Sequence, residues 1–163
     1  LSRMESGIIA VHSEDTTITQ MLESIQQQVN VKVREKNITL SLCDTDLHIR
    51  CDSKWTVEAL GNIVDNAIKY TACGGNVQIK VEQYSFFVKI DIIDDGIGIE
   101  KEEIPKIFGR FYRSLSVADQ PGVGIGLFLA REIIQAQKGY IKVTSERGKG
   151  SIFSVFLPIS KKE

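Results

Sequence analysis

One predicted helix, over residues 53–71, carries a row of polar side chains that limits what this chain can fold into. Steps of three, four and eight residues return to nearly the same helix face, so Asn62, Asn66, Lys69 and Tyr70 share one narrow stripe. Apolar side chains lie beside that stripe, at Ile63, Val64, Ala67 and Ile68. A solvated helix face usually mixes Glu and Lys, whereas two amides, an ammonium and a phenol suit a polyanion. The helix therefore has to pack on a core with one side and border a binding site with the other.

The elements expected around this helix are those of an α+β domain. We expect a short edge strand within residues 8–18, a helix over 19–37, strands over 38–43 and 48–51 that pair with each other, and a hairpin of 77–81 and 87–94. A short helix over 101–111, a loop over 114–122, a helix from Gly124 or Gly126 to Lys138, and strands over 140–145 and 151–157 complete the pattern. Because the strands are grouped in hairpins, we expect a two-layer sandwich: a mixed, mostly antiparallel sheet of about five strands with three main helices on one face.

The composition is that of an ordinary globular domain and excludes several function classes. The 163 residues are 42% hydrophobic and 25% charged, with a net charge of −1, which fits one domain with a good core. A charge balance this near to neutral gives no support for nonspecific nucleic-acid binding or a basic membrane surface. No apolar run approaches the roughly 20 residues that span a bilayer, and no signal peptide opens the chain. The three cysteines and two histidines lack metal-site spacing, so we expect reduced thiols in a cytoplasmic setting.

Residues 87–94 form a predicted strand that ends at a pair of aspartates. Val88, Ile90 and Ile92 share one face with Asp94, so Asp94 rather than Asp95 should enter the interior. A half-buried carboxylate needs a donor partner. The exocyclic amine of adenine is such a donor, whereas the keto oxygen of guanine would repel the carboxylate. For these residues alone, a β-turn with an Asx cap remains the alternative.

Three glycines, Gly122, Gly124 and Gly126, stand directly before an amphipathic helix. Glycine lets the backbone approach a phosphate, and the free N–H groups of a helix N-terminus attract an anion. The segment lacks the Gly-Lys-Ser/Thr ending of a Walker A loop, and it lacks the preceding strand of a Rossmann fingerprint. The small, polar residues at 114–121 suit a mobile lid, and a flexible loop without a ligand is the alternative.

Three further groups have chemistry that suits a nucleotide. The amide oxygen of Asn66 can join phosphate and water oxygens around Mg²⁺, and Lys69 can neutralise phosphate charge. Phe108 and Phe111 are spaced as anchors, with an arginine on each side of Phe111 available to phosphate. Taken alone, each group also has an ordinary explanation, which is surface exposure for the helix residues and core packing for the phenylalanines.

In their order along the chain, these segments resemble the catalytic, ATP-binding domain of bacterial sensor histidine kinases, in the GHKL superfamily with the Bergerat ATP-binding fold. Residues 62–71 resemble its asparagine box, 94–98 its first glycine box, 108–113 its phenylalanine box and 122–127 its second glycine box. Residues 148–151, Gly-Lys-Gly-Ser, resemble its final Gly-x-Gly-Ser/Thr element. Residues 1–7 resemble the end of the dimerisation and phosphoacceptor hairpin, which leaves residues 8–163 as the catalytic domain.

The resemblance implies roles for particular residues in binding ATP and Mg²⁺. Asn66 would hold Mg²⁺, Lys69 and Tyr70 would contact phosphate or ribose, and Asp94 would bind the adenine amine. Arg113 would contact the γ-phosphate, and it forms the implied catalytic set together with Asn66 and Lys69. The other residues implied to surround the nucleotide are Asn62, Gly96, Gly98, Ile99, Phe108, Gly122, Gly124, Gly126 and Leu127.

The chain departs from the family pattern at two residues and in one motif. Asp95 stands where Asn is usual, and Gly109 replaces an acidic or polar residue of the phenylalanine box. The phosphoacceptor motif, His followed by an acidic residue and Arg/Lys-Thr-Pro, does not occur, and His12 is followed by Ser-Glu-Asp. We therefore expect the acceptor histidine on a separate dimerisation domain upstream.

The activity implied by the resemblance is that of a protein-histidine kinase in a two-component system. It would transfer the γ-phosphoryl group of ATP to the acceptor histidine, for phosphorelay to a response regulator. Its partners would be its own dimerisation domain and the receiver domain of that regulator, with no nucleic acid and no membrane contact by this chain. The chain alone would be monomeric and cytoplasmic, within a homodimeric protein anchored in the cell membrane.

Two other function classes stay open. One is an ATP hydrolase of the same superfamily, as in type II topoisomerases, mismatch-repair proteins and heat-shock chaperones, and the other is a non-catalytic nucleotide-binding scaffold. The hydrolases place a Glu one helical turn before the Mg²⁺ asparagine, where it activates water. This chain has Asn62 at that position, and an amide cannot take a proton at neutral pH. The sequence therefore favours transfer over hydrolysis.

Overall fold

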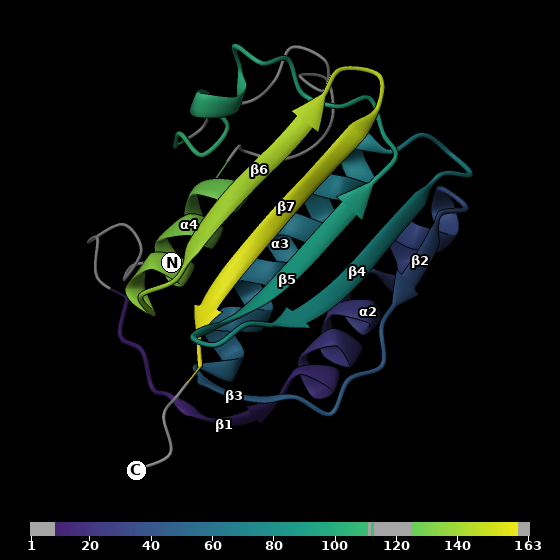
Figure 1. The fold of residues 1–163 in the computed structure, drawn as a ribbon. Helices are drawn as coiled ribbons and strands as arrows, with labels where there is room; N and C mark the ends of the chain where they lie inside the picture. Colours follow the sequence, from purple (N-terminus) through teal and green to yellow (C-terminus); the bar gives the residue numbers. More distant parts are fainter. Residues whose placement is uncertain (1–8, 111, 113–124, 160–163) are drawn as a thin grey trace.

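A computed structural model of the protein describes residues 9–110, 112 and 125–159. These residues form a twisted sheet with helices against it (Figure 1). The first elements along the chain are β1 (Glu14–Thr17), α2 (Ile18–Glu35), β2 (Thr39–Leu42), β3 (His48–Cys51) and α3 (Ser53–Tyr70). They are followed by β4 (Asn76–Gln83), β5 (Phe87–Asp94), the short 3-10 helix η1 (Ile104–Lys106), α4 (Gly126–Ala136), β6 (Tyr140–Glu146) and β7 (Gly150–Pro158).

Both long helices begin at a side-chain cap. Thr17 accepts a hydrogen bond from Gln20 N at 3.3 Å at the start of α2, and Asp52 accepts one from Trp55 N at 3.0 Å at the start of α3. Such caps satisfy N–H groups that a helix leaves without a partner in its first turn. The helices predicted over 19–37 and 53–71 are therefore confirmed, with ends shifted by a residue or two. No helix in the described part of the chain has both the length and the apolar character to cross a bilayer.

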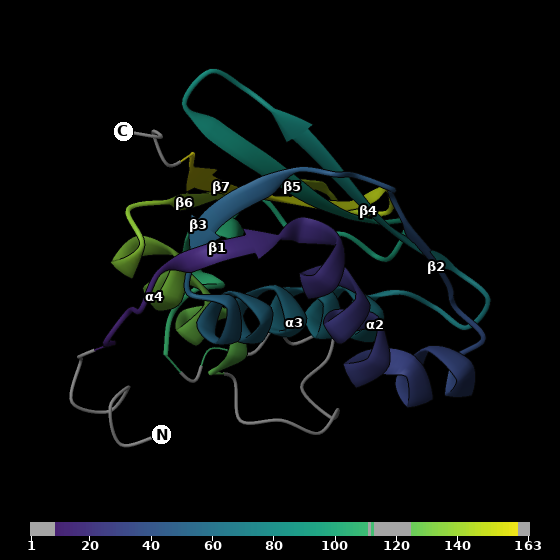
Figure 2. The same cartoon turned by 90° about the horizontal axis from the view of Figure 1, so that it is seen from below.

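The main sheet has the strand order β2-β4-β5-β7-β6, in which β2 and β4 are parallel and the other neighbours antiparallel. Within the described part of the chain, the three α-helices lie on one face of this sheet and leave the other face open, as Figure 2 shows. The expected α+β sandwich, with a mixed and mostly antiparallel sheet of five strands, is confirmed.

One predicted strand pairing is wrong. We expected residues 48–51 to pair with 38–43, but β3 pairs antiparallel with β1 in a separate two-stranded sheet, and β2 pairs with β4. The link between β2 and β3 contains no tight-turn dipeptide of the kind that closes a hairpin. It is held instead at the start of α2, where Thr19 Oγ1 donates to Thr45 O at 2.6 Å and Ile18 N donates to Leu47 O at 3.1 Å. These contacts direct β3 toward β1.

The helix predicted over residues 101–111 is reduced to η1 and a series of turns. Pro105 stands at the fifth position of the predicted helix. There it removes a backbone donor, and its ring would clash with the carbonyl one turn earlier. The region consequently forms only a 3-10 turn, with Gly109 N donating to Lys106 O at 2.9 Å.

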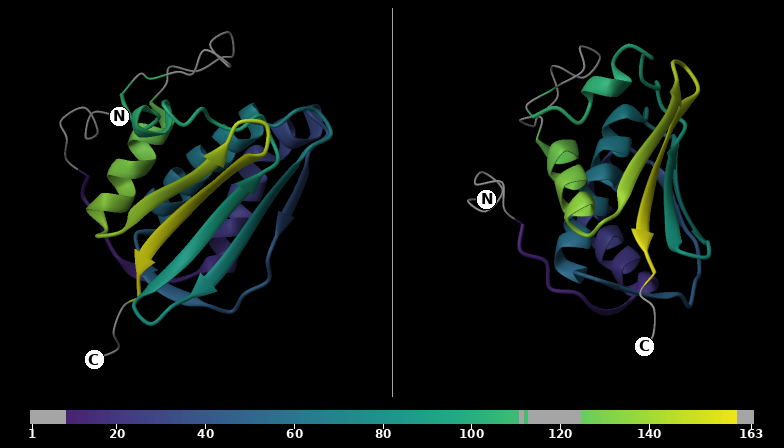
Figure 3. Two further views of the ribbon diagram at one scale, coloured as in Figure 1. Left: turned by 45° about the horizontal axis from the view of Figure 1, so that its top comes forward. Right: turned by 60° about the vertical axis from the view of Figure 1, so that its left-hand side comes forward.

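The core lies between the helix layer and the sheet, and it fixes α3 as the central helix. Figures 1 and 3 show α3 between α2 and α4, behind the strands. The buried side chains of α3 meet the inward-facing rows of the sheet, in which every second residue of β5 and β7 is buried. The largest fully buried side chains include Leu60, Ile63, Ile68, Ile90, Ile92 and Phe153. A helix held this firmly gives its polar stripe a fixed position.

Candidate functional site

The polar stripe of α3 stays half-exposed beside buried neighbours. Asn62, Asn66, Lys69 and Tyr70 are each partly exposed. The apolar residues beside them, Ile63, Val64, Ala67 and Ile68, are at most 2% exposed. The predicted division of this helix into a core side and an open polar side is confirmed.

Asp94 ends β5 inside the protein, as the alternation of β5 predicts. Its exposed fraction is 4%, whereas Asp95 is exposed. Gly96 N donates to Asp94 Oδ1 at 2.9 Å, and the backbone N–H of Ser151 is a second donor to the carboxylate. Burial raises the pKa of Asp94 from 3.8 to about 6, although both hydrogen bonds oppose this shift. The carboxylate keeps lone pairs for one more donor.

Asp95 has a different task from its neighbour. Its two carboxylate oxygens accept from Asn76 N and Asn76 Nδ2, each at 2.9 Å. These hydrogen bonds hold the pKa of Asp95 below its usual value. Asp95 thus ties the end of β5 to the beginning of β4, because both of its carboxylate oxygens accept from Asn76, one from the backbone and one from the side chain.

The turn after Asp94 packs closely against the end of α3 on one side and the β6–β7 turn on the other. Ile97 N donates to Tyr70 O at 3.1 Å. A Cβ at Gly96 would lie 2.3 Å from Tyr70 O, and one at Gly98, where φ is +74°, would lie 2.2 Å from Glu146 O. Only glycine fits at either position. The turn therefore brings the backbone of Tyr70 close to Gly96, and Gly98 close to the β6–β7 turn.

Ser145 and Ser151 complete this end of the site, and the sequence analysis did not select either as a binding residue. Ile99, which is 3% exposed, donates its N–H to Ser145 Oγ at 2.8 Å. Ser151 is 4% exposed and stands directly opposite Asp94 in the β5–β7 register. A hydroxyl on the inward face of a strand needs a partner, and that signal is present at residue 145 in the alternation of β6.

The two asparagines of the stripe have different surroundings. Asn62 Nδ2 donates to Gly126 O at 3.2 Å, which joins α3 to the first residue of α4. Asn66 makes no side-chain hydrogen bond within the described residues. Its amide oxygen is therefore available as a metal ligand, while the Asn62 amide is engaged with backbone.

Lys69 lies beside a carboxylate that the predicted stripe left out. Its Nζ is 3.9 Å from Asp65 Oδ2, and Lys32 Nζ of α2 is 2.5 Å from Asp65 Oδ1. Asp65 and Lys69 are one helical turn apart, so this pair follows from sequence spacing. The contact with Lys32 joins two helices and could not be read from the stripe.

Other predicted site residues lie in the core or outside the described residues. Phe108 is 7% exposed, and its ring packs edge-on against that of Phe153, with 6.3 Å between the ring centroids. The guanidinium carbon of Arg131 lies over the Phe108 ring, 5.2 Å from its centroid. This placement fits the core-packing explanation, and a nucleotide contact of Phe108 stays a prediction. Leu127 is half-buried against the core. Arg113, Gly122, Gly124, the loop over 114–122 and residues 1–7 all fall outside the described residues.

The side chains at the site suit a magnesium ion that arrives with a nucleotide better than a resident metal. Within the described ranges, no group of three or more His, Cys, Asp or Glu side chains could hold a metal ion. Asn66 supplies a single oxygen. Because Mg²⁺ commonly binds through one or two protein groups together with phosphate and water oxygens, this donor set fits that mode.

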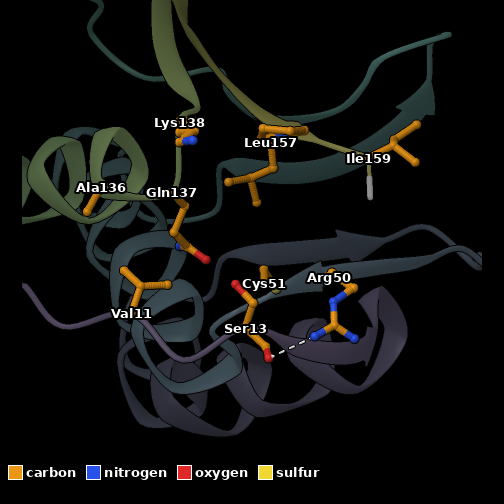
Figure 4. A pocket seen from close by; sticks show the side chains of 10 residues that line it. Val11, Ser13, Arg50, Cys51, Ala136, Gln137, Lys138, Leu157 and Ile159 are labelled. Carbon is orange, nitrogen blue, oxygen red and sulfur yellow. Dashed lines mark hydrogen bonds between the residues drawn. The ribbon is translucent and has the colours of Figure 1, made fainter. Parts of the chain in front are cut away.

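A separate hollow of about 310 Å³ lies at the far end of β7 (Figure 4). It is lined by Val11, Ser13, Arg50, Cys51, Ala136, Gln137, Lys138, Leu157, Pro158 and Ile159. Asp94 is paired with Ser151 at the beginning of β7, so the strand separates the two places by roughly 25 Å. None of the predicted site residues lines this hollow.

The chain matches one protein family and is similar in sequence to several sensor kinases. The pattern of the family described as "Histidine kinase-, DNA gyrase B-, and HSP90-like ATPase" matches residues 51–161. The Sensor protein kinase PmrB of Pseudomonas aeruginosa is 30% identical over 97% of the chain, and the Sensor histidine kinase WalK of Bacillus subtilis is 32% identical over 100%. The chain spans 33% and 28% of the length of these two relatives.

Solved structures give the same picture for the fold. A mycobacterial sensor histidine kinase, MprB, superposes with a TM-score of 0.79 at 25% identity, covering 91% of this chain and 98% of that one. The catalytic domain of histidine kinase ThkA superposes with a TM-score of 0.79 at 24% identity, covering 91% of this chain and 96% of that one. The fold seen here is therefore that of solved histidine kinase domains.

Proposed function

The chain belongs to the family of histidine kinase-, DNA gyrase B- and HSP90-like ATPases, and from this premise we propose that it is the ATP-binding catalytic domain of a sensor histidine kinase. It transfers the γ-phosphoryl group of Mg²⁺–ATP to a histidine on a separate dimerisation domain, for relay to a response regulator. The names of the similar sensor kinases support this activity, and the chain's own residues supply the chemistry that the activity needs.

The observation that carries the proposal is the Asp94 carboxylate. It is buried, it receives N–H donors from Gly96 and Ser151, and it keeps capacity for one donor more. The exocyclic amine of adenine is a donor that fits this need, and guanine presents an acceptor at the same place. The turn that follows Asp94 touches the end of the polar stripe through Tyr70 O. A nucleotide whose base lies at Asp94 then has the stripe beside its phosphates.

Positioning and charge neutralisation are the main requirements of phosphoryl transfer. Asn66 would hold the magnesium ion through its amide oxygen, and the ammonium of Lys69 would neutralise phosphate charge. Arg113, which lies outside the described residues, would contact the γ-phosphate. Bound Mg²⁺ would supply charge neutralisation of the phosphate oxygens. Asp65, one turn before Lys69, orients that lysine through the 3.9 Å contact between them.

Two features of α3 favour transfer over hydrolysis. Asn62 occupies the position one turn before Asn66, and its amide donates to Gly126 O instead of accepting a proton. Asp65 is the carboxylate nearest in sequence to Asn66, and it already contacts Lys32 and Lys69. A water-activating base needs a free acceptor within reach of the water. The amide of Asn62 cannot take a proton at neutral pH, and the carboxylate of Asp65 is paired with two ammonium groups that favour its ionised, less basic form.

The partners follow from the same proposal. One is the dimerisation domain that carries the acceptor histidine, and the other is the receiver domain of a response regulator. One structural neighbour, histidine kinase ThkA, has been solved in complex with the response regulator protein TrrA. The chain works on the cytoplasmic side of a homodimeric kinase that is anchored in the membrane.

Calorimetric titration of the 163-residue chain with Mg²⁺–ATP and Mg²⁺–GTP tests the nucleotide part of the proposal. We expect ATP to bind and GTP to bind at least tenfold more weakly, because the guanine keto oxygen would face a carboxylate. Asp94→Asn should weaken ATP binding and reduce the preference for ATP. Equal affinities for ATP and GTP, or unchanged ATP affinity in Asp94→Asn, would contradict the proposal.

A further inference from the structure

Ser145 connects the two segments that border the base of the candidate site. It lies near the end of β6, on the strand face that packs toward the helices. Its Oγ lies 2.8 Å from Ile99 N, 3.0 Å from Gly150 O and 2.7 Å from Ser151 Oγ. Ile99 ends the turn that begins at Asp94, and Ser151 faces Asp94 across the β5–β7 pair. The Ser145 hydroxyl therefore contacts both the turn that follows Asp94 and the residue that lies opposite Asp94 on β7.

The direction of each hydrogen bond follows from the number of protons available. A serine hydroxyl has one proton to donate and two lone pairs to accept with. Ile99 N can only donate and Gly150 O can only accept, so the single proton of Ser145 goes to Gly150 O. Ser151 must then be the donor in the 2.7 Å contact between the two hydroxyls. This arrangement satisfies all three contacts of Ser145.

We propose that Ser145 is a positioning residue for nucleobase recognition. It accepts the hydrogen bond that the Ser151 hydroxyl donates, and so leaves the Asp94 carboxylate for the amino group of the ligand. With its proton directed at Ser145, Ser151 Oγ presents only lone pairs to its other neighbours. Side chains directly opposite in an antiparallel pair have Cβ atoms roughly 5 Å apart, so Ser151 and Asp94 are within reach of each other. The inference rests on the proposed function, because it assumes that a nucleotide base lies at Asp94.

Removal of the Ser145 hydroxyl should have two separable effects. Ile99 N loses its acceptor in a buried place, which loosens the turn and weakens every nucleotide alike. The Ser151 hydroxyl also loses its acceptor and becomes free to donate to the carboxylate opposite. A carboxylate occupied in this way gains less from an incoming amine, so the second effect falls only on ligands that carry one.

The two effects are separated by titrating the 163-residue chain with ATP and with purine riboside triphosphate, which has hydrogen in place of the 6-amino group. In the unaltered chain, loss of the amine should weaken binding about tenfold or more, because the acceptor is charged. In Ser145→Ala, both nucleotides should bind more weakly, and the affinities for ATP and for purine riboside triphosphate should differ by less than about threefold. Ser145→Thr keeps the hydroxyl and should behave as the unaltered chain.

Two further variants make the test specific. Thr144→Ala removes a hydroxyl from the open face of the same strand and should leave the tenfold difference intact. Ser145→Ala combined with Ser151→Ala removes the competing donor as well, and should restore the dependence on the amine. If Ser145→Ala does not fold, Ser145→Cys replaces it, because a thiol is only a weak acceptor.

The outcomes distinguish this inference from the proposed function. If ATP still binds about tenfold more tightly than purine riboside triphosphate in Ser145→Ala or Ser145→Cys, the role assigned to Ser145 is overturned, even if both nucleotides bind more weakly overall. Failure of the double variant to regain that dependence would also overturn it. If the unaltered chain binds neither nucleotide, the proposed function itself is wrong. A chain that binds ATP with no preference for the amine contradicts the place given to Asp94.

Discussion

Asp94 is a buried carboxyl whose ionisation weakens the fold. Burial raises its pKa from 3.8 to about 6, so the folded protein holds the proton more tightly than the unfolded chain does. The stability contributed by the protonated carboxyl is complete below about pH 4 and is lost as the pH rises to about 6. At neutral pH the ionised carboxylate destabilises the unliganded protein by about 3 kcal/mol. Under the proposed function, the amine of the bound nucleotide would offset part of this penalty.

We therefore predict that Asp94→Asn stabilises the unliganded protein while it weakens ATP binding. At pH 7 the gain in the free energy of unfolding should be up to about 3 kcal/mol, and at pH 4 it should shrink below about 1 kcal/mol. Urea denaturation at the two pH values measures both quantities. Asp95→Asn is the matched control, because Asp95 is exposed and its pKa is lowered rather than raised. A gain that is equal at both pH values would contradict the buried-charge explanation.

Asn66 should carry the magnesium dependence of nucleotide binding. We predict that Asn66→Ala abolishes the difference in ATP affinity between solutions with Mg²⁺ and with EDTA, and leaves the affinity in EDTA within about threefold. Titration calorimetry in both solutions gives the comparison. Asn30→Ala, an exposed asparagine on α2, is the control and should keep the magnesium effect. A full magnesium effect in Asn66→Ala would assign the metal to another residue.

The sequence predicted whether a side chain is buried, and which neighbours it has, where these depend only on the repeat of a strand or a helix. The alternation of β5 placed Asp94 inside and Asp95 outside, and helical spacing placed Asn66 and Lys69 on one stripe. The alternation of β6 places Ser145 on the inward face, but its partners could not be predicted, because they come from the turn at Ile99 and from the neighbouring strand. The hydrogen bonds of Asp95 could not be predicted either, because its partner Asn76 is 19 residues away in sequence.

At the scale of elements, α2 supports the end of α3 that carries the site. Lys36 Nζ donates to Ile68 O at 2.7 Å and to Lys69 O at 3.3 Å. The last carbonyls of a helix have no partners within it and carry partial negative charge, so a lysine there satisfies and stabilises the helix end. The element boundaries themselves were largely predictable, because caps and periodicity are local. The pairing of β3 depends on tertiary contacts. The loss of the helix around Pro105 follows from the backbone N–H that this proline lacks.

Lys36→Met should loosen this helix end without changing the apolar packing of the lysine stem. We predict a loss of about 1–2 kcal/mol in the free energy of unfolding, because a charged donor to two carbonyls is removed. Lys54→Met, at an exposed site in the first turn of α3, should change stability by no more than about 0.5 kcal/mol. Thermal or urea unfolding of the two variants makes the comparison. Equal effects of the two substitutions would show that the contact between Lys36 and α3 is not stabilising.

At the scale of the whole molecule, the candidate site lies at one end of the sheet. The turn after β5, the β6–β7 turn and the end of α3 meet there through backbone hydrogen bonds from Ile97 to Tyr70 and from Gly148 to Ile97. These segments are separated by as many as 78 positions in the sequence, from Tyr70 to Gly148. Their order along the chain resembled a known domain, which made the fold predictable. The contacts that join them became visible only in three dimensions.

The central claim is phosphoryl transfer to histidine, and radiolabelling of the natural full-length protein tests it most directly. The protein is incubated with Mg²⁺ and ATP labelled at the γ-phosphate, beside an Asn66→Ala variant. We predict label on the protein that is lost in acid and kept in base, as phosphohistidine requires, and no label on the variant. Release of labelled inorganic phosphate by the unaltered protein, without any acid-labile label on protein, would contradict transfer and point to hydrolysis.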